Sequence, residues 1–383
     1  MAAVHPSRPD RPSVTDLYFD YNATAPLRDA AFDAVAGALR RYGNASSVHR
    51  AGRGVRAAIE SAREQLAARL GRAADGVIFT SGGTEANNLA VRGFPGRRLL
   101  VSAVEHPSVG AGPVDGIVAV DRDGIVDLAA LDALLAADPQ PALLAVMLAN
   151  NETGVIQPIA EIARVAHRHG ALLHVDAVQA FGKLDPDWDR LGADLLSLSA
   201  HKIGGPPGVG ALVLADPDRA PQALIQGGGQ ERRHRAGTEN MPAIVGFAAA
   251  LEDLGDIGAE TARLQALKDR LESACQAALP DMVVLGRAAP RLANTVCLAL
   301  PTLAAHTLVM ALDLEGIAVS AGSACSSGKV APSAVLLAMG ETALAGAAIR
   351  VSLGWGSTAQ EIELFIERFV AVANRLSARH RAA

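Results

Sequence analysis

The sequence predicts an α/β fold, in which helices flank a mostly parallel β-sheet and a smaller α+β domain follows. Short apolar runs without polar alternation are typical of strands buried on both faces of such a sheet. They alternate with amphipathic helical stretches, and the pattern changes near residue 255. At roughly 150 residues per domain, the 383 residues suggest two domains. The runs lie at 99–104, 143–148, 172–175, 195–198 and 210–214.

The helices follow from apolar residues that recur every three or four positions. The pattern predicts a helix over 53–70 and another over 261–279. A strand is expected at 295–300, and a helix is expected to begin after Ala304. The last helix has an apolar face made of Ile362, Phe365, Ile366, Phe369 and Val372.

These elements divide into two domains. We expect a large α/β domain over 17–254 and a small α+β domain over 255–383, joined by the N-terminal segment 1–16. A run rich in Gly and Ser at 320–331 predicts a mobile loop within the small domain.

Composition excludes several classes of protein. The net charge of −5 and the 3% aromatic content argue against nucleic-acid binding. No uncharged apolar run approaches the roughly 18–20 residues that cross a bilayer, and the N-terminus does not resemble a signal peptide. The three cysteines form no CxxC pair and lie near no zinc-like histidine spacing, so we expect no metal site and a reducing, cytoplasmic location.

Polar residues follow four of the expected strands at the point where each ends. They are Glu105-His106, the Asn-Asn-Glu run at 150–152, Asp176, and the Ser-Ala-His-Lys run at 199–202. Ligands of open α/β sheets bind just outside the carboxyl ends of the strands. We therefore expect a functional site at this edge of the sheet.

Three features of this edge suit a phosphate-bearing cofactor. The string TSGGTEANN at 80–88 follows an apolar run and opens a helix, as an anion site requires; the alternative is an ordinary turn capped by Thr84. Lys202, at a strand end before a Gly/Pro turn, is a candidate Schiff-base nucleophile, although surface lysines are commoner. Asp176 suits a pyridinium partner but is also a good helix cap. A nucleotide fingerprint is absent, which argues against an NAD-dependent dehydrogenase.

Seven strings in this order and spacing resemble the class V aminotransferase family, and within it the cysteine desulfurases. The resemblance runs from Phe19 to the C-terminal helix. It implies the pyridoxal-phosphate fold type I, with a seven-stranded type of sheet. The strings are TSGGTEANN, VEHPSV, NNETG, HVDAVQ, SAHKIGGPPGVG, RAGTEN and GSACSSG.

The resemblance also implies roles for residues of this sequence. Lys202 would bond covalently to pyridoxal 5'-phosphate, His106 would stack on its ring and share proton transfer, and Asp176 would hold the ring nitrogen. Gln179 would bond the phenolic oxygen. Asn151 would contact the cofactor and, with Arg350, bind the substrate carboxylate. The phosphate would be held by Gly83, Thr84, Ser199, His201 and, from the other subunit of a homodimer, Thr238.

The cysteines separate into two kinds. Cys275 and Cys297 fall on apolar segments, which is typical of inert core residues. Cys325 lies among small residues in the 320–331 loop and is a candidate nucleophile that travels between the cofactor and an acceptor.

The implied activity is the conversion of L-cysteine to L-alanine, with sulfur passing to Cys325 as a persulfide. An iron–sulfur cluster scaffold or another sulfur-acceptor protein would then receive it. Three alternatives stay open at this point. They are a selenocysteine lyase, another class V aminotransferase, and a sulfur-carrier or scaffold partner without turnover.

Overall fold

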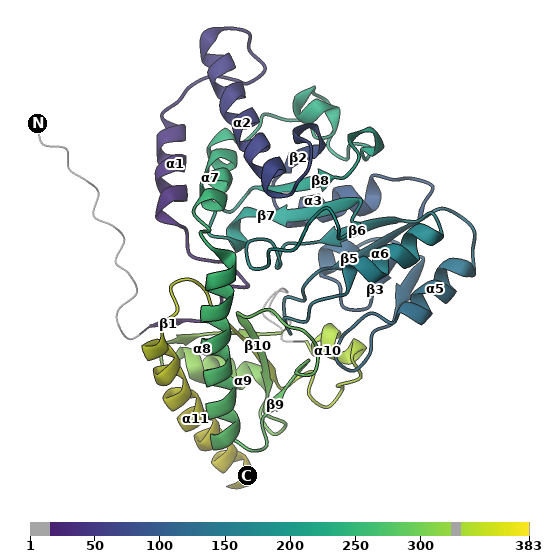
Figure 1. Ribbon diagram of the computed structural model, residues 1–383. Helices are drawn as coiled ribbons and strands as arrows, with labels where there is room; N and C mark the ends of the chain where they lie inside the picture. The colour runs from purple at the N-terminus through teal and green to yellow at the C-terminus, as the bar shows by residue number, and fades with distance from the viewer. Residues whose placement is uncertain (1–15, 323–330, 383) are drawn as a thin grey trace, which may run out of the picture.

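The structure is a computed structural model that describes residues 16–322 and 331–382. Its centre is a seven-stranded sheet in the order β2-β8-β7-β6-β5-β3-β4 (Figure 1). Strands β4, β3, β5, β6 and β7 are mutually parallel, whereas β8 is antiparallel to both of its neighbours. The bounds are β2 Val77–Thr80, β3 Arg98–Ser102, β4 Gly116–Val118, β5 Ala142–Met147, β6 Leu172–Asp176, β7 Leu195–Ser199 and β8 Gly210–Leu214.

Both faces of this sheet are buried. Along β3, Leu99 and Val101 pack in one apolar cluster while Leu100 packs in the other, as expected from the alternation of side chains along a strand. Helices α3 (Gly83–Arg92) and α4 (Pro107–Gly110) cover one face. The other face is covered by α1 (Asp29–Leu39), α2 (Arg50–Arg69), α5 (Leu128–Ala136), α6 (Ile159–Arg168) and α7 (Met241–Glu252).

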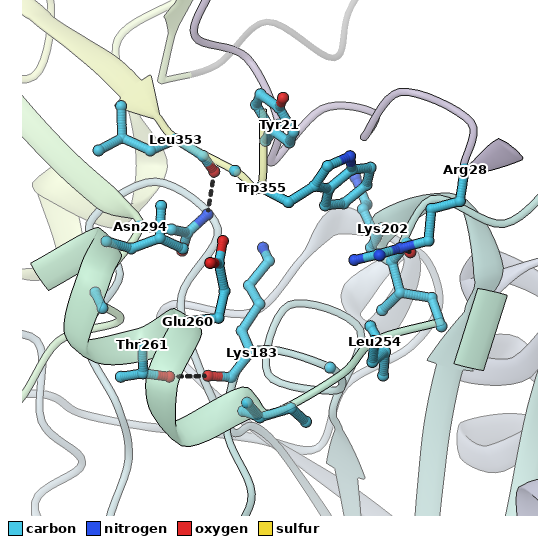
Figure 2. A pocket seen from close by; sticks show the side chains of 16 residues that line it. Tyr21, Arg28, Lys183, Lys202, Leu254, Glu260, Thr261, Asn294, Leu353 and Trp355 are labelled. Carbon is cyan, nitrogen blue, oxygen red and sulfur yellow. Dashed lines mark hydrogen bonds between the residues drawn. The ribbon is translucent and has the colours of Figure 1, made fainter. Parts of the chain in front are cut away.

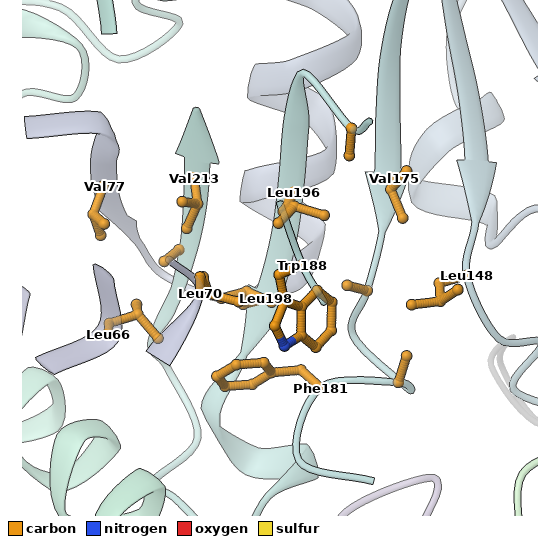
Figure 3. Packing of buried hydrophobic residues seen from close by; sticks show 14 of the residues in the cluster. Leu66, Leu70, Val77, Leu148, Val175, Phe181, Trp188, Leu196, Leu198 and Val213 are labelled. Carbon is orange, nitrogen blue, oxygen red and sulfur yellow. The ribbon is translucent and has the colours of Figure 1, made fainter. Parts of the chain in front are cut away.

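Figure 3 shows part of the second cluster, which lies between the helices and the strands. Leu66 and Leu70 from the end of α2 lie on the same side as Leu196 of β7, and the Phe181 and Trp188 rings meet edge to face at 5.9 Å. Because strands such as β5 are buried on both faces, their sequence shows an apolar run rather than alternation.

The smaller sheet has four antiparallel strands in the order β12-β13-β10-β9. Its apolar cluster includes residues of α8, α9 and α11, and Figure 1 shows the long α8 running from the large sheet along the small one. The bounds are β9 Val283–Val284, β10 Thr295–Ala299, β12 Ser320–Ala321, β13 Ala348–Ser352, α8 Ile257–Ala278, α9 Ala305–Asp313, α10 Ala334–Ala338 and α11 Ala359–Ala382.

Residues 1–15 lie outside the described chain. Residues 17–24, called the N-terminal segment from here on, join the two sheets. Strand β1 (Leu17–Tyr18) pairs with β11 (Ile317–Ala318) in parallel, and Phe19 packs edge to face on Phe365 of α11. The chain then passes Asn22, which lies beside the carboxyl end of the large sheet through contacts described below. A segment near the start of the chain therefore reaches the predicted site.

The predicted α/β class with a mostly parallel sheet is confirmed, and the expected helices begin and end within a few residues of α2, α8, α9 and α11. One detail differs. The run at 210–214 is a strand as expected, but β8 runs against its neighbours because the tight Gly/Pro turn after Lys202 reverses the chain and returns it beside β7. In the part of the chain that the structure describes, no helix is long and apolar enough to cross a membrane.

Candidate active site

The parallel strands bring the polar strand ends to one edge of the large sheet. Neighbouring strands are in register there, with Met147 of β5 beside Asp176 of β6, and Asp176 beside Ser197 of β7. Glu105, which follows β3, accepts a hydrogen bond from the Met147 N–H at 2.7 Å and so links the ends of β3 and β5. The predicted clustering of these strand ends is therefore present in the fold.

Lys202 ends a short 3-10 helix (Ala200–Lys202) directly after β7. Its Nζ donates to the backbone carbonyls of Asn22 at 2.6 Å and Ala23 at 2.8 Å. Figure 2 shows Lys202 lining a cavity between the two sheets together with Lys183, Tyr21 and other residues. The amine is thus held inside the molecule and is not a surface lysine.

Asp176 is the last residue of β6 and is 5% exposed. Its Oδ1 accepts from the Val178 N–H at 2.9 Å, and its Oδ2 accepts from Asn87 Nδ2 at 2.7 Å. Burial raises the pKa of this carboxyl, whereas the two N–H donors and the nearby His106 and Lys202 lower it. The group is a buried carboxylate that is oriented by two donors, as a partner for a protonated ring nitrogen must be.

His106 is connected to Asp176 through two intermediate side chains. Asn87 Nδ2 donates to Ser108 Oγ at 2.9 Å, and that oxygen lies 2.7 Å from His106 Nδ1. The Ser108 N–H also donates to Nδ1, at 3.1 Å, so a neutral imidazole carries its proton on Nε2. Burial lowers the pKa of His106, which favours this neutral form.

The expected phosphate loop lies at the start of α3. The helix begins at Gly83 with Gly82 as N-cap, and no side chain caps it. Thr84 is therefore inside the first turn, and the alternative of a Thr84-capped turn is wrong. A Cβ on Gly83 would lie 2.8 Å from Val178 and 3.4 Å from Ser199, so glycine lets the helix start pack against the end of β7. The exposed N–H groups suit an anion.

His201 lies on the other side of the same edge. Its Nδ1 is 3.1 Å from Thr24 Oγ1. Burial and the nearby Lys202 and Lys183 lower the pKa of His201 to about 4, so the ring is neutral at physiological pH. A neutral ring offers one N–H to an acceptor such as a phosphate oxygen.

Gln179 and Lys183 form a polar group next to Lys202. Lys183 Nζ donates to Gln179 Oε1 at 2.7 Å and to Asn22 Oδ1 at 2.8 Å. Gln179 Nε2 in turn donates to the Asn22 carbonyl at 2.9 Å, which is the same oxygen that accepts from Lys202. Asn22 is thus bonded to both lysines.

Arg350 lies in β13 of the small sheet and is 5% exposed. Its Nη2 donates to Asp20 at 2.7 Å, and its Nη1 donates to the Asn151 carbonyl at 3.1 Å. Its buried Nε has no hydrogen-bond partner among the described residues. The structure therefore places Arg350 and Asn151 together, with one guanidinium donor still available.

Two predicted residues lie apart from this group. Thr238 is exposed, in a segment anchored by the ion pair between Arg235 and Glu85 at 2.9 Å. Cys325 lies outside the described residues. Cys275 and Cys297 are 0% and 1% exposed, and burial raises the pKa of both thiols, as expected for core cysteines.

Several residues that contact this group had no role assigned from the sequence. Among them are Asp20, Asn22, Asn87, Ser108 and Lys183. Asn87 lies within the TSGGTEANN string and Ser108 within VEHPSV, so the strings themselves were the signal for these two. The others contact the group through the fold alone, and no local pattern pointed to them.

The residues present fit pyridoxal 5'-phosphate. The uncapped start of α3 suits its phosphate, the Asp176 carboxylate suits its ring nitrogen, and the Lys202 amine suits its aldehyde. Asn87 Oδ1 is buried without a partner among the described residues, so it is an acceptor that a bound group with an N–H or O–H could satisfy. In the described part of the chain, no three His, Cys, Asp or Glu side chains are grouped to hold a metal.

Comparison with known proteins agrees with this geometry. The family model described as Aminotransferase class-V matches residues 17–365. This chain belongs to that family. Its members depend on pyridoxal phosphate, and the match spans both sheets of the structure.

Similar proteins cover nearly the whole chain. A cysteine desulfurase of Cereibacter sphaeroides is 43% identical over 381 residues, covering 94% of this chain and 97% of its own length. Cysteine desulfurase IscS of Dictyoglomus turgidum is 38% identical over 378 residues, covering 94% and 95%. Among solved structures, a NifS-like protein from Rickettsia africae has a TM-score of 0.88 at 34% identity, covering 94% and 99%. SspA in complex with cysteine has a TM-score of 0.76 at 30% identity, covering 88% and 98%.

Proposed function

We propose that this chain is a pyridoxal-phosphate-dependent cysteine desulfurase that converts L-cysteine to L-alanine and transfers the sulfur to its own Cys325. One observation carries the proposal. The Lys202 amine and the Asp176 carboxylate lie at the ends of adjacent parallel strands, with His106 connected to Asp176 through Asn87 and Ser108. The names of the similar proteins, and the cysteine bound to SspA, support this reaction.

In this proposal several residues hold the cofactor. Lys202 Nζ would bond to the aldehyde carbon, Asp176 would keep a proton on the ring nitrogen, and Gln179 Nε2 would donate to the phenolic oxygen. When bound, the cofactor supplies an electron sink that stabilises negative charge on the substrate Cα. His106 would stack on the ring, and Asn151 would contact it. The phosphate would be held by Gly83, Thr84, Ser199, His201 and Thr238 of the partner subunit.

Arg350 and Asn151 bind the substrate carboxylate. Arg350 Nε, which has no partner among residues 16–322 and 331–382, provides a donor, and a guanidinium offers the paired geometry that a carboxylate prefers. Asp20, which now bonds Nη2, would share or yield that donor when the substrate enters. Its hydrogen bond holds the guanidinium in one orientation until then.

Protons move between side chains of this chain. After the substrate amine has replaced Lys202 on the cofactor, the freed Lys202 amine would remove the substrate Cα proton. The Asn22 and Ala23 carbonyls, which accept from Nζ, would hold the freed amine at the site. Neutral His106, with its proton on Nε2, donates to or accepts from the substrate and product. The lowered pKa of His106 keeps this form at physiological pH.

Cys325 acts as the sulfur acceptor. Its thiolate attacks the substrate Sγ, so that an S–S bond forms, the Cβ–Sγ bond breaks and the bonding pair goes to Cβ, which is protonated. The balance is L-cysteine plus enzyme thiol giving L-alanine plus enzyme persulfide. An iron–sulfur scaffold or another acceptor protein then takes up the sulfur from Cys325. We propose that the enzyme is a homodimer and that it acts in the cytoplasm.

A Cys325→Ser variant tests this function. It should keep the visible cofactor absorbance and bind L-cysteine, but form no persulfide and release sulfide at least about a hundredfold more slowly, because the nucleophile is lost. Matched controls are Cys275→Ala and Cys297→Ala, which remove buried thiols and should keep persulfide formation.

Wild-type rates of sulfide and alanine production in Cys325→Ser would contradict the proposal. Faster amino transfer to a keto acid than sulfide release in the wild type would indicate another class V aminotransferase. A purified protein without cofactor absorbance would support a carrier without turnover.

A further inference from the structure

Among the residues that the structure describes, Lys183 is the one lysine beside the proposed active site that the proposed reaction does not use. It follows β6 in the sequence, and its side chain lines the cavity shown in Figure 2. Its Nζ donates to the side chains of Asn22 and Gln179. Burial and the neighbouring Lys202 and Arg350 lower the pKa of Lys183 well below its ordinary value. Holding an amine at this position therefore costs free energy, and a compensating role is expected.

The cavity beside Lys183 does not suggest a second substrate site. Its volume of ≈ 50 Å³ has room for a few water molecules but not for an amino acid. Apolar and aromatic side chains such as Leu254 and Trp355 contribute much of its wall. The role of Lys183 must therefore be sought in the groups that its Nζ contacts.

The hydrogen bonds of Lys183 fix the orientation of two amides. Lys183 Nζ donates to Gln179 Oε1 at 2.7 Å and to Asn22 Oδ1 at 2.8 Å, and a lysine amine has the two N–H groups that these bonds need whether or not it is protonated. Gln179 Nε2 then faces the Asn22 carbonyl, an obligate acceptor, at 2.9 Å. The bond from Lys183 and the bond to the Asn22 carbonyl therefore require the same orientation of the Gln179 amide.

This orientation matters for the cofactor site. Nε2 carries two hydrogens, and the bond to the Asn22 carbonyl uses one of them. With Oε1 held by Lys183, the second hydrogen is the group that Gln179 can offer to a ligand. If the amide were reversed, Gln179 would present an acceptor to the phenolic oxygen and repel it when ionised.

We propose that Lys183 is a positioning residue, which holds the carbonyl of Gln179 so that its Nε2 donates to the phenolic oxygen of the cofactor. This inference rests on the proposed function and adds to it the residue that orients the phenolic-oxygen donor. A competing explanation is a direct electrostatic effect on Lys202, because the two lysines bond different oxygens of the same Asn22. A double-mutant cycle separates the two.

The experiment uses purified holoenzyme of the full chain and measures the visible cofactor band and the rate at which pyridoxal phosphate is lost after dilution. Lys183→Met and Gln179→Leu should each speed cofactor loss about tenfold, the equivalent of one hydrogen bond, and shift the band in the same direction. In the Gln179→Leu background, Lys183→Met should change the loss rate by less than about twofold, because the two residues act as one unit.

Lys268→Met is the matched control. Lys268 is 2% exposed and donates to the Leu292 carbonyl at 3.0 Å, away from Gln179, so this variant removes a buried amine without touching the amide. It should leave the band and the loss rate unchanged. If Lys183→Met does not fold, Lys183→Gln keeps an N–H donor on a shorter side chain, and it should retain the cofactor within about threefold of wild type.

Equal effects of Lys183→Met in the wild-type and Gln179→Leu backgrounds would overturn the proposal in favour of direct action on Lys202. Cofactor loss from folded Lys183→Gln as fast as from Gln179→Leu would also overturn it. A wild-type protein that binds no pyridoxal phosphate would instead remove the proposed function on which the inference rests. These outcomes are distinguishable because the wild-type spectrum is measured first.

Discussion

Two buried arginine–carboxylate pairs in this molecule differ in how completely they are bonded. Behind β2, all three guanidinium nitrogens of Arg63 have partners, and Glu231 takes two of them at 2.7 Å and 2.8 Å while also accepting from the Phe79 N–H. Between the two sheets, Arg350 bonds Asp20 through Nη2 only, and its Nε is unpartnered in the described part of the chain.

The difference separates a structural pair from one that is available to a ligand. Glu231 begins a stretch of three residues with φ between 43° and 72°, a region that non-glycine residues rarely occupy, so its ion pair stabilises a strained turn. A buried ion pair that stabilises such a turn needs a partner for each of its donors. Arg350 has a donor that no described residue uses, and the Asp20 side chain is 18% exposed against 2% for Glu231. An incomplete buried pair is thus the better indication of a binding site.

We expect the largest effect from a substitution that breaks the Arg63–Glu231 pair. Glu231→Ala should lower the free energy of unfolding by about 3–5 kcal/mol, because Arg63 would stay buried without its partner. Urea denaturation followed by circular dichroism measures the loss. Asp20→Ala is the comparison variant and should lose less, since its carboxylate is more exposed and satisfies fewer donors. Equal losses in the two variants would remove the distinction.

A smaller effect is expected at the ligand-binding pair. Arg350→Lys keeps the charge but not the planar fork, so KM for L-cysteine should rise about 10- to 100-fold, with a smaller change in kcat. Steady-state sulfide release measures both constants. Arg63→Lys is the matched control, in which KM should stay as in the wild type. An unchanged KM in Arg350→Lys would argue against the substrate role.

The architecture and the position of the site were predictable from the sequence. Strands such as β5 and β8 appear as apolar runs, because burial on both faces leaves no room for polar residues. The polar residues at the ends of β6 and β7, and directly after β7, then locate the site, since parallel strands deliver their carboxyl ends to one edge. The seven ordered strings, through their resemblance to a known family, predicted the cofactor.

The supporting residues were not predictable, because their contacts join distant parts of the chain. Asp20 meets Arg350 across 330 residues, and Asn22 meets Lys202 across 180. Lys183 resembles any lysine that follows a strand, and only the folded chain shows its Nζ between two amide oxygens. Such partners depend on how the N-terminal segment passes between the sheets, which no local pattern encodes.

The central claim is that Lys202 is the residue that bonds the cofactor. Reduction of the purified protein with borohydride, followed by peptide mapping with mass spectrometry, tests it most directly. We predict one pyridoxyl adduct per chain, on the peptide that contains Lys202. An adduct on the Lys183 peptide, or no adduct on either lysine, would contradict the account.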